Sequence, residues 1–244
     1  MHSPQLSRFC QLSLAEVLLS TYPGTELLLP AMNRDVFVFD GHNDLAARLL
    51  EEPEMDFFSG EKAKHISLEA LQKGHIFGGL FALFIPPTKD EHSGGAGKEG
   101  EELPGRVSME RARRIVRKEI SALLRLIEGS DGRIRLARSV EEIEQSRNDG
   151  SVAVVLHMEG AEAISRSFEE LDLYYAAGLR SLGPVWSRHN RFGHGVPIYR
   201  KGSPDTADGL TSAGRKLIRR CNELGIVVDL SHMSERGFWD VAKL

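Results

Sequence analysis

The sequence is poor in the residues that build disulfide-rich, membrane-spanning and nucleic-acid-binding proteins. Its two cysteines, Cys10 and Cys221, are too few and too far apart for a disulfide framework or a cysteine zinc site. No uninterrupted apolar run reaches the about 18 residues that a membrane-spanning helix needs. The 31 basic residues do not outnumber the 35 acidic ones, which excludes a strongly basic nucleic-acid-binding character. We therefore expect a cytoplasmic protein that binds neither membrane nor nucleic acid.

The first thirty residues differ from the rest of the chain. Glu16 and Glu26 break up their apolar residues, and the basic start and clean apolar run of a signal peptide are not seen. We expect residues 1–31 to form an N-terminal extension, and we leave open whether translation begins at Met32 instead.

From Val36 onward, short apolar runs alternate with helical patterns. The expected strands cover residues 36–39, 78–85, 152–156, 179–186 and 226–230, and the expected helices cover residues 108–128, 168–177 and 211–224. Residues 88–105 and 187–209 read as long polar loops. Strands that are nearly continuous in Val, Ile, Leu and Phe and alternate with helices indicate a parallel sheet covered by helices. The pattern therefore predicts an α/β fold.

Side chains that bind metals follow three of these apolar runs. His42 and Asp44 come after the first run, Glu159 after the third and His232 after the fifth. In a parallel α/β barrel, the carboxyl ends of the strands meet on one face, where functional groups collect. An imidazole and carboxylates suit a divalent ion such as zinc. We predict a metal site there, with the alternative that His42 and Asp44 only pair with each other at a turn.

Other polar residues have less specific surroundings. We expect His157 to be packed inward, although it could instead form a second His-x-carboxylate pair with Glu159. His189 and His194 lie in a polar loop, where either could be a surface residue or reach a substrate. The sequence around Ser187 does not suggest the histidine and acid partners of a catalytic triad. No Gly-x-Ser-x-Gly elbow occurs either, so we do not expect a serine hydrolase.

Five strings taken together resemble the membrane dipeptidase (renal dipeptidase) family, including its soluble bacterial members. The similarity runs in the expected order from about Phe37 to the end of the chain. The strings are Asp-Gly-His-Asn-Asp-Leu at 40–45, His-Met-Glu-Gly at 157–160, Gly-Leu-Arg-Ser-Leu at 178–182, Gly-Leu-Thr at 209–211 and Leu-Gly-Ile-Val-Val-Asp-Leu-Ser-His-Met-Ser at 224–234.

The resemblance implies a (β/α)₈ barrel of the TIM type that binds two zinc ions and hydrolyses dipeptides. By matching positions, His42 and Asp44 would hold one ion, Glu159 would bridge both, and His232 would hold the other. A water or hydroxide shared by the two ions would attack the scissile carbonyl. Family members also tolerate a D-residue at the C-terminal position of the substrate.

The resemblance also bears on substrate contacts. Mammalian members have a substrate-binding histidine after the fourth strand, and the matching place in this sequence is Trp186. His189 or His194 could take over that role. We therefore expect Trp186 and His194 to bind the substrate.

About five of the eight β/α units of such a barrel are recognisable. The family's further metal-binding histidine, substrate arginine and aspartate would lie beyond Leu244. We expect residues 32–244 to be the amino-terminal portion of a dipeptidase barrel that binds one metal ion well and has little or no activity. A homodimer is left open. The alternatives are another barrel metal-dependent amidohydrolase or deaminase, which typically opens with His-x-His, and a non-catalytic fragment.

Overall fold

The computed structural model describes residues 36–60, 66–87, 106–196 and 208–244. The expected extension, residues 1–31, and the expected loop at 88–105 lie outside the described residues. Six strands form one sheet, and all five of its strand pairings are parallel. The strands are β1 (Val38–Asn43), β2 (Ile76–Phe84), β3 (Ile134–Leu136), β4 (Val152–Glu159), β5 (Leu179–Gly183) and β6 (Val227–Val228).

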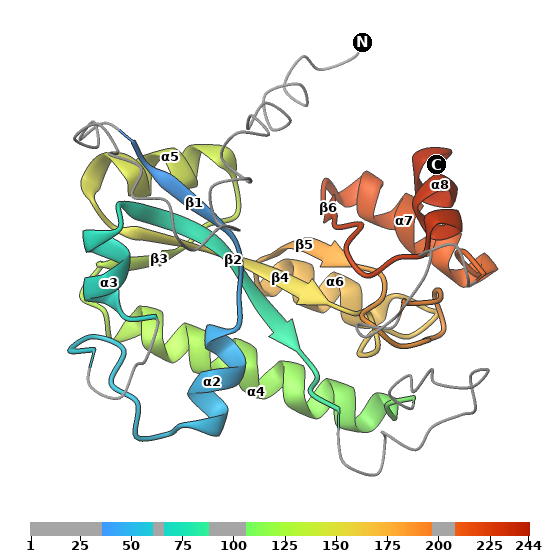
Figure 1. Cartoon of the computed structure of the whole chain (residues 1–244), viewed down its shortest axis with the longest axis horizontal. Coiled ribbons are helices and arrows are strands. Elements are labelled where there is room, and N and C mark those ends of the chain that lie inside the picture. The colour runs from blue at the N-terminus through green and yellow to red at the C-terminus, as the bar shows by residue number, and fades with distance from the viewer. Residues whose placement is uncertain (1–35, 61–65, 88–105, 197–207) are drawn as a thin grey trace, which may run out of the picture. The chain divides into compact units, whose positions relative to one another are not determined.

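The strand order along the sheet is β1-β2-β4-β5-β6, as Figure 1 shows. The short strand β3 pairs with the first half of β4, from Val152 to Val154, while β5 pairs with the second half of β4. This arrangement is a half-barrel of parallel strands, so the predicted α/β fold with five of the eight barrel units is confirmed.

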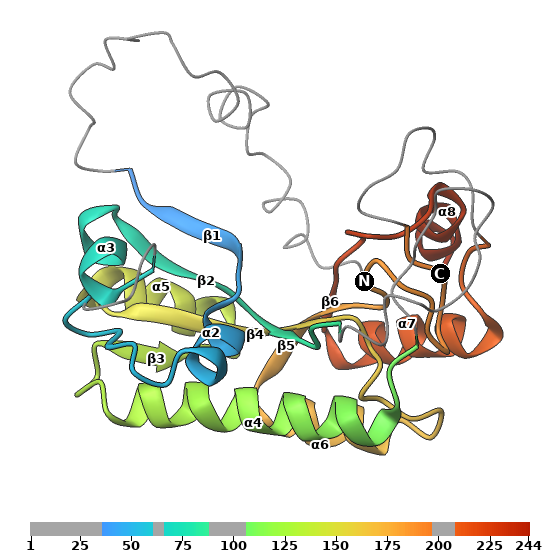
Figure 2. The ribbon, with the colours of Figure 1, turned by 60° about the horizontal axis from the view of Figure 1, so that its bottom comes forward.

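Helices lie between successive strands along the chain, except that α8 follows β6. They are α2 (Leu45–Glu51), α3 (Leu68–Lys73), α4 (Met109–Glu128), α5 (Val140–Asp149), α6 (Glu169–Ala177), α7 (Ser212–Leu224) and α8 (Glu235–Ala242). Figure 2 shows α4 and α6 on the same side of the sheet, where an ion pair between Arg113 and Glu170 joins them. Among the described residues, no helix is both long enough and apolar enough to cross a membrane.

The strand bounds differ from expectation where the sequence is polar. β1 and β4 continue through the polar residues His42 and Glu159, because hydrogen bonding to neighbouring strands extends past the apolar run. The expected strand at 179–186 ends at Gly183, since Pro184 has no backbone N–H to continue the ladder. The sequence reading missed β3, whose three residues alternate around Arg135 and carry too little periodicity to be recognised.

The centre of the sheet is buried and closely packed. Every residue of β4 is buried between its neighbours. Two glycines of β2 allow the flanking strands to approach, because a Cβ on Gly78 would lie 2.8 Å from Ala153 and one on Gly79 would lie 2.8 Å from Asp40. Because the strands pack this closely, the carboxyl ends of β1, β2 and β4 lie next to one another.

Candidate metal centre

The end of β1 presents two of the predicted ligands. His42 lies in the strand, and Asp44 occupies the N-cap position of α2. The Asp44 side chain makes no capping hydrogen bond, whereas Asn43 accepts one from the N–H of Leu45 at 3.3 Å. The Asp44 carboxylate is therefore free to face His42, and its Oδ1 lies 3.4 Å from His42 Nε2. The structure thus contains the pairing of the two residues that we considered as an alternative.

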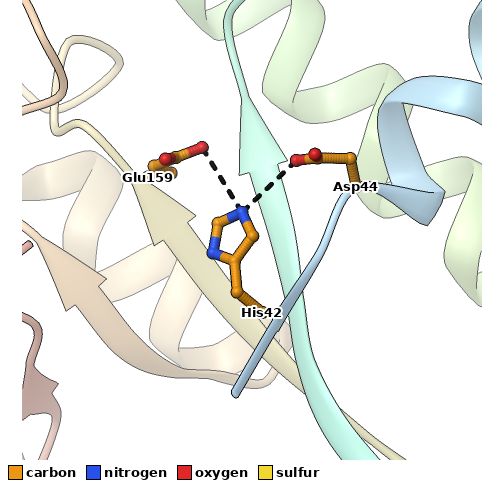
Figure 3. A group of neighbouring side chains, drawn as sticks. All are labelled: His42, Asp44 and Glu159. Atoms are coloured by element: carbon orange, nitrogen blue, oxygen red, sulfur yellow. Dashed lines mark hydrogen bonds and ion pairs between the residues drawn. The ribbon is translucent and has the colours of Figure 1, made fainter. Parts of the chain in front are cut away.

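The end of β4 brings a carboxylate to the same place. Glu159 is the last residue of β4 and lies level with Phe84 of β2 and Gly183 of β5. Its Oε2 lies 3.7 Å from His42 Nε2, so the imidazole nitrogen faces two carboxylates, as Figure 3 shows. One ligand atom from each of His42, Asp44 and Glu159 lies within 4.8 Å of the others. Three potential ligands therefore converge on one volume.

His232 approaches the group from the other side of Glu159. It follows β6, and its Nε2 lies 3.0 Å from Oε1 of Glu159. The two oxygens of Glu159 therefore face two different histidines, His42 through Oε2 and His232 through Oε1. A carboxylate placed in this way is able to contact two cations at once.

The charges at the group favour a cation. The hydrogen bond with Asp44 raises the pKa of His42 above its ordinary value against the effect of burial, with a further contribution from the charge of Glu159. The same hydrogen bond lowers the pKa of Asp44. Carboxylates that stabilise a protonated imidazole also stabilise a divalent ion in the place of its proton. The donor set of one nitrogen and carboxylate oxygens fits zinc or a similar ion.

Comparison with known proteins identifies the family. The profile of the membrane dipeptidases, peptidase family M19, matches residues 29–244. The chain belongs to the membrane dipeptidase family. A solved metallopeptidase named dipeptidase AC is 42% identical, with a TM-score of 0.78 over 86% of this chain. A metallopeptidase from Rhodobacter sphaeroides, solved with a phosphinate mimic of the dipeptide L-Ala-D-Ala, is 41% identical, with a TM-score of 0.78 over 86% of this chain.

This chain spans only part of these M19 relatives. An uncharacterized protein from the PQQ-III 3′ region of Acinetobacter calcoaceticus is 36% identical over 215 residues, which cover 86% of this chain and 68% of that protein. The chain covers 60% of dipeptidase AC and 62% of the Rhodobacter enzyme.

The two residues expected to bind an M19 substrate lie in different places. Trp186 is only 8% exposed, and its ring centroid lies 5.0 Å from that of Phe84 and 6.1 Å from that of His232. The buried guanidinium of Arg188 lies over its ring. Trp186 is therefore packed beside the predicted ligand His232.

His194 does not line the same hollow as the predicted metal ligands. Its ring lies 4.3 Å from that of His189, and burial, together with the nearby His194, lowers the pKa of His189. His194 lines a hollow of about 260 Å³ with Arg236. A larger hollow of about 580 Å³ includes His42, Glu159 and His232. A substrate role for His194 stays a prediction.

The structure also reveals two lines of contacting polar side chains that the sequence did not indicate. The first line is centred on His157 and the second on His232. The prediction that His157 packs inward is confirmed, since it is 0% exposed. Its Nδ1 lies 2.9 Å from Ser181 Oγ and its Nε2 lies 3.5 Å from Asp229 Oδ2. Burial lowers the pKa of His157, with the charge of Asp229 opposing it.

The second line overturns the expectation that Ser187 has no histidine and acid partners. Ser187 Oγ lies 2.9 Å from Nδ1 of His232, which in turn contacts Glu159. Because Ser187 is 1% exposed, a substrate cannot reach its hydroxyl, so the line is not a serine-hydrolase triad. Ser187 and His232 are 45 residues apart, and no local spacing signals their contact.

Proposed function

We propose that this chain hydrolyses dipeptides with the help of bound zinc. The observation that carries the proposal is the convergence of His42, Asp44 and Glu159 at the ends of β1 and β4. Membership of the M19 family supports the reaction class, because its solved relatives are metallopeptidases.

The proposed ligand sets divide between two ions. His42 and Asp44 would hold one ion, Glu159 would bridge both, and His232 would hold the other. The opposed directions of the two Glu159 oxygens support the bridging role. Bound zinc supplies Lewis-acid polarisation of the scissile carbonyl and lowers the pKa of a water molecule towards about 7.

The chain's own residues provide charge and shape around this chemistry. Glu159 is 8% exposed, so its negative charge acts in a partly dry setting where electrostatic attraction is stronger than in water. We propose that the ring of Trp186 forms an apolar wall beside His232 against which a small substrate side chain packs. We also propose that His194 approaches the substrate from the loop between β5 and α7.

The proposed substrates are small dipeptides with either an L- or a D-residue at the C-terminal position. The Rhodobacter relative is 41% identical and was solved with a mimic of L-Ala-D-Ala, which makes L-Ala-D-Ala the first substrate to assay.

The test is hydrolysis of L-Ala-D-Ala and L-Ala-L-Ala by the purified 244-residue chain with added Zn²⁺. We expect slow, zinc-dependent hydrolysis, with tight uptake of one metal ion at the group of His42, Asp44 and Glu159 and weaker uptake of a second ion at His232. Elemental analysis gives the stoichiometry, and light scattering of the same sample tests whether the chain forms a homodimer.

The matched control is Glu159→Gln, which keeps the size of the side chain and removes the charge that the ions share. We expect it to reduce hydrolysis to the uncatalysed background. Zinc-dependent hydrolysis of cyclic amides without cleavage of either dipeptide would favour the alternative amidohydrolase function. Metal uptake without hydrolysis of any substrate would favour a non-catalytic role.

A further inference from the structure

His232 adopts a backbone conformation that needs outside support. Its φ of 63° lies in the left-handed region, which is strained for a residue with a side chain. The N–H of Val196 donates to the carbonyl oxygen of His232 at 2.9 Å, and Gly195 forms an antiparallel bridge with Met233. The loop after β5 therefore holds the His232 backbone in place.

The same loop closes tightly enough to reach the side chain of His232. A Cβ on Gly195 would lie 1.7 Å from the carbonyl oxygen of Trp186, so only glycine permits this approach. The closure places Ser187 Oγ 2.9 Å from Nδ1 of His232, while Nε2 faces Glu159 at 3.0 Å. Both nitrogens of the imidazole therefore have partners within hydrogen-bonding distance.

These partners require different proton positions with and without a metal. A carboxylate only accepts hydrogen bonds, so in the absence of metal the Nε2–H of a neutral His232 donates to Glu159 and the bare Nδ1 accepts from Ser187. An Nε2 that binds a metal must offer its lone pair, so the proton moves to Nδ1, which then donates to Ser187 Oγ. A serine hydroxyl can serve in both states, because it is both a donor and an acceptor and can rotate.

We propose that Ser187 is a positioning residue that lets His232 exchange one tautomer for the other without moving its ring. The inference rests on the proposed metal role of His232. It adds that the buried hydroxyl of Ser187 sets the affinity of His232 for the ion.

The chain provides a matched control in Ser181. Like Ser187, Ser181 is 1% exposed and lies 2.9 Å from Nδ1 of a histidine, but that histidine is His157, whose Nε2 faces Asp229. Ser181→Ala removes the same kind of buried contact without touching His232. It shows how much the loss of a buried serine–histidine hydrogen bond changes Zn²⁺ affinity when the histidine is not His232.

The experiment is ¹⁵N NMR of the histidine rings in the whole chain at mildly alkaline pH, during a chelator-buffered Zn²⁺ titration. The signals of His232 are assigned by their loss in His232→Gln. We expect His232 to carry its proton on Nε2 without metal and on Nδ1 with Zn²⁺. Ser187→Ala should weaken Zn²⁺ binding at His232 by about 10- to 100-fold, as is typical of residues that support a metal ligand. Ser181→Ala should leave that affinity unchanged, and Ser187→Thr, which keeps the hydroxyl, should restore most of it.

Three results would overturn the inference. His232 could keep the same tautomer on Zn²⁺ saturation, Ser187→Ala could bind Zn²⁺ at His232 as tightly as the unchanged chain, or Ser187→Ala and Ser181→Ala could weaken it equally. Failure of the unchanged chain to bind Zn²⁺ at all would instead overturn the proposed function and this inference with it. The titration of the unchanged chain therefore separates the two failures.

Discussion

At the scale of single residues, the most unusual group outside the candidate metal centre is the carboxyl of Glu119. It lies on α4 and is 0% exposed. Burial raises its pKa from 4.5 to about 8, and neither oxygen of the carboxyl has a hydrogen-bond partner among the described residues. Glu119 therefore keeps its proton in the folded protein at neutral pH, whereas the unfolded chain loses it.

This difference predicts that stability falls as pH rises. Between pH 4.5 and about 8 the folded state binds a proton that the unfolded state has released, so the free energy of unfolding decreases through this window by roughly a few kcal/mol. Glu119→Gln has no proton to lose and should flatten the decrease. Urea denaturation at several pH values, with a chelator to remove metal, measures the effect.

The control for Glu119→Gln is Glu128→Gln, at an exposed position of the same helix. It should leave the pH dependence as it is. A pH profile of Glu119→Gln parallel to that of the unchanged chain would show that Glu119 is not the group responsible.

At the scale of elements, α7 shows how tightly the helices join the loops of the site. Thr211 caps the helix by accepting a hydrogen bond from the N–H of Gly214 at 3.0 Å. A Cβ on Gly214 would lie 1.9 Å from the carbonyl oxygen of Phe192, which belongs to the loop after β5. The glycine therefore lets α7 pack directly on the loop that carries Ser187.

Gly214→Ala should destabilise the protein, contrary to the usual effect of this change in a helix. Alanine normally favours a helix over glycine by about 1 kcal/mol, but here the methyl group would push α7 away from Phe192. Gly129→Ala is the control, because its Cβ would meet its nearest neighbour at an ordinary 3.4 Å and its φ of −75° suits alanine. Thermal unfolding compares the two, and equal melting temperatures would contradict the expected clash.

At the scale of the whole molecule, the candidate metal centre joins distant parts of the chain. Its ligands come from β1, from the N-cap of α2 and from the end of β4, and His232 adds the segment after β6. A metal ion that binds these ligands only when they are assembled stabilises the folded state over the unfolded one.

Zinc should therefore raise the melting temperature. A free Zn²⁺ concentration about 100 times the Kd stabilises the folded state by about 2.7 kcal/mol. For a chain of this size, this corresponds to an increase of about 5 to 10 °C in the melting temperature. Differential scanning calorimetry with Zn²⁺ and with a chelator measures the difference. Glu159→Gln should abolish most of the increase, and an unchanged melting temperature in the native sequence would argue against an assembled site.

Much of the fold and part of the site could be predicted from the sequence because the signals are local. Five apolar runs marked five of the six strands, and His42, Asp44 and Glu159 were recognisable as strand-end residues. The family motifs were equally local strings. The parallel sheet covered by helices followed from the alternation of strands and helices, and the barrel followed from the family resemblance.

Other features were decided by the tertiary structure alone. The contact between Ser187 and His232 spans 45 residues, and the left-handed backbone of His232 depends on Gly195 and Val196. Asp44 could have capped α2, but in the folded chain it faces His42.

The sequence by itself therefore determined five of the six strands and three of the seven helices of the described residues, together with the family. Only the folded structure decided which polar groups meet and at what distance. The physical reason is that periodicity and short motifs act over a few neighbouring residues, whereas the partners of a buried histidine are set by packing between segments far apart in the chain.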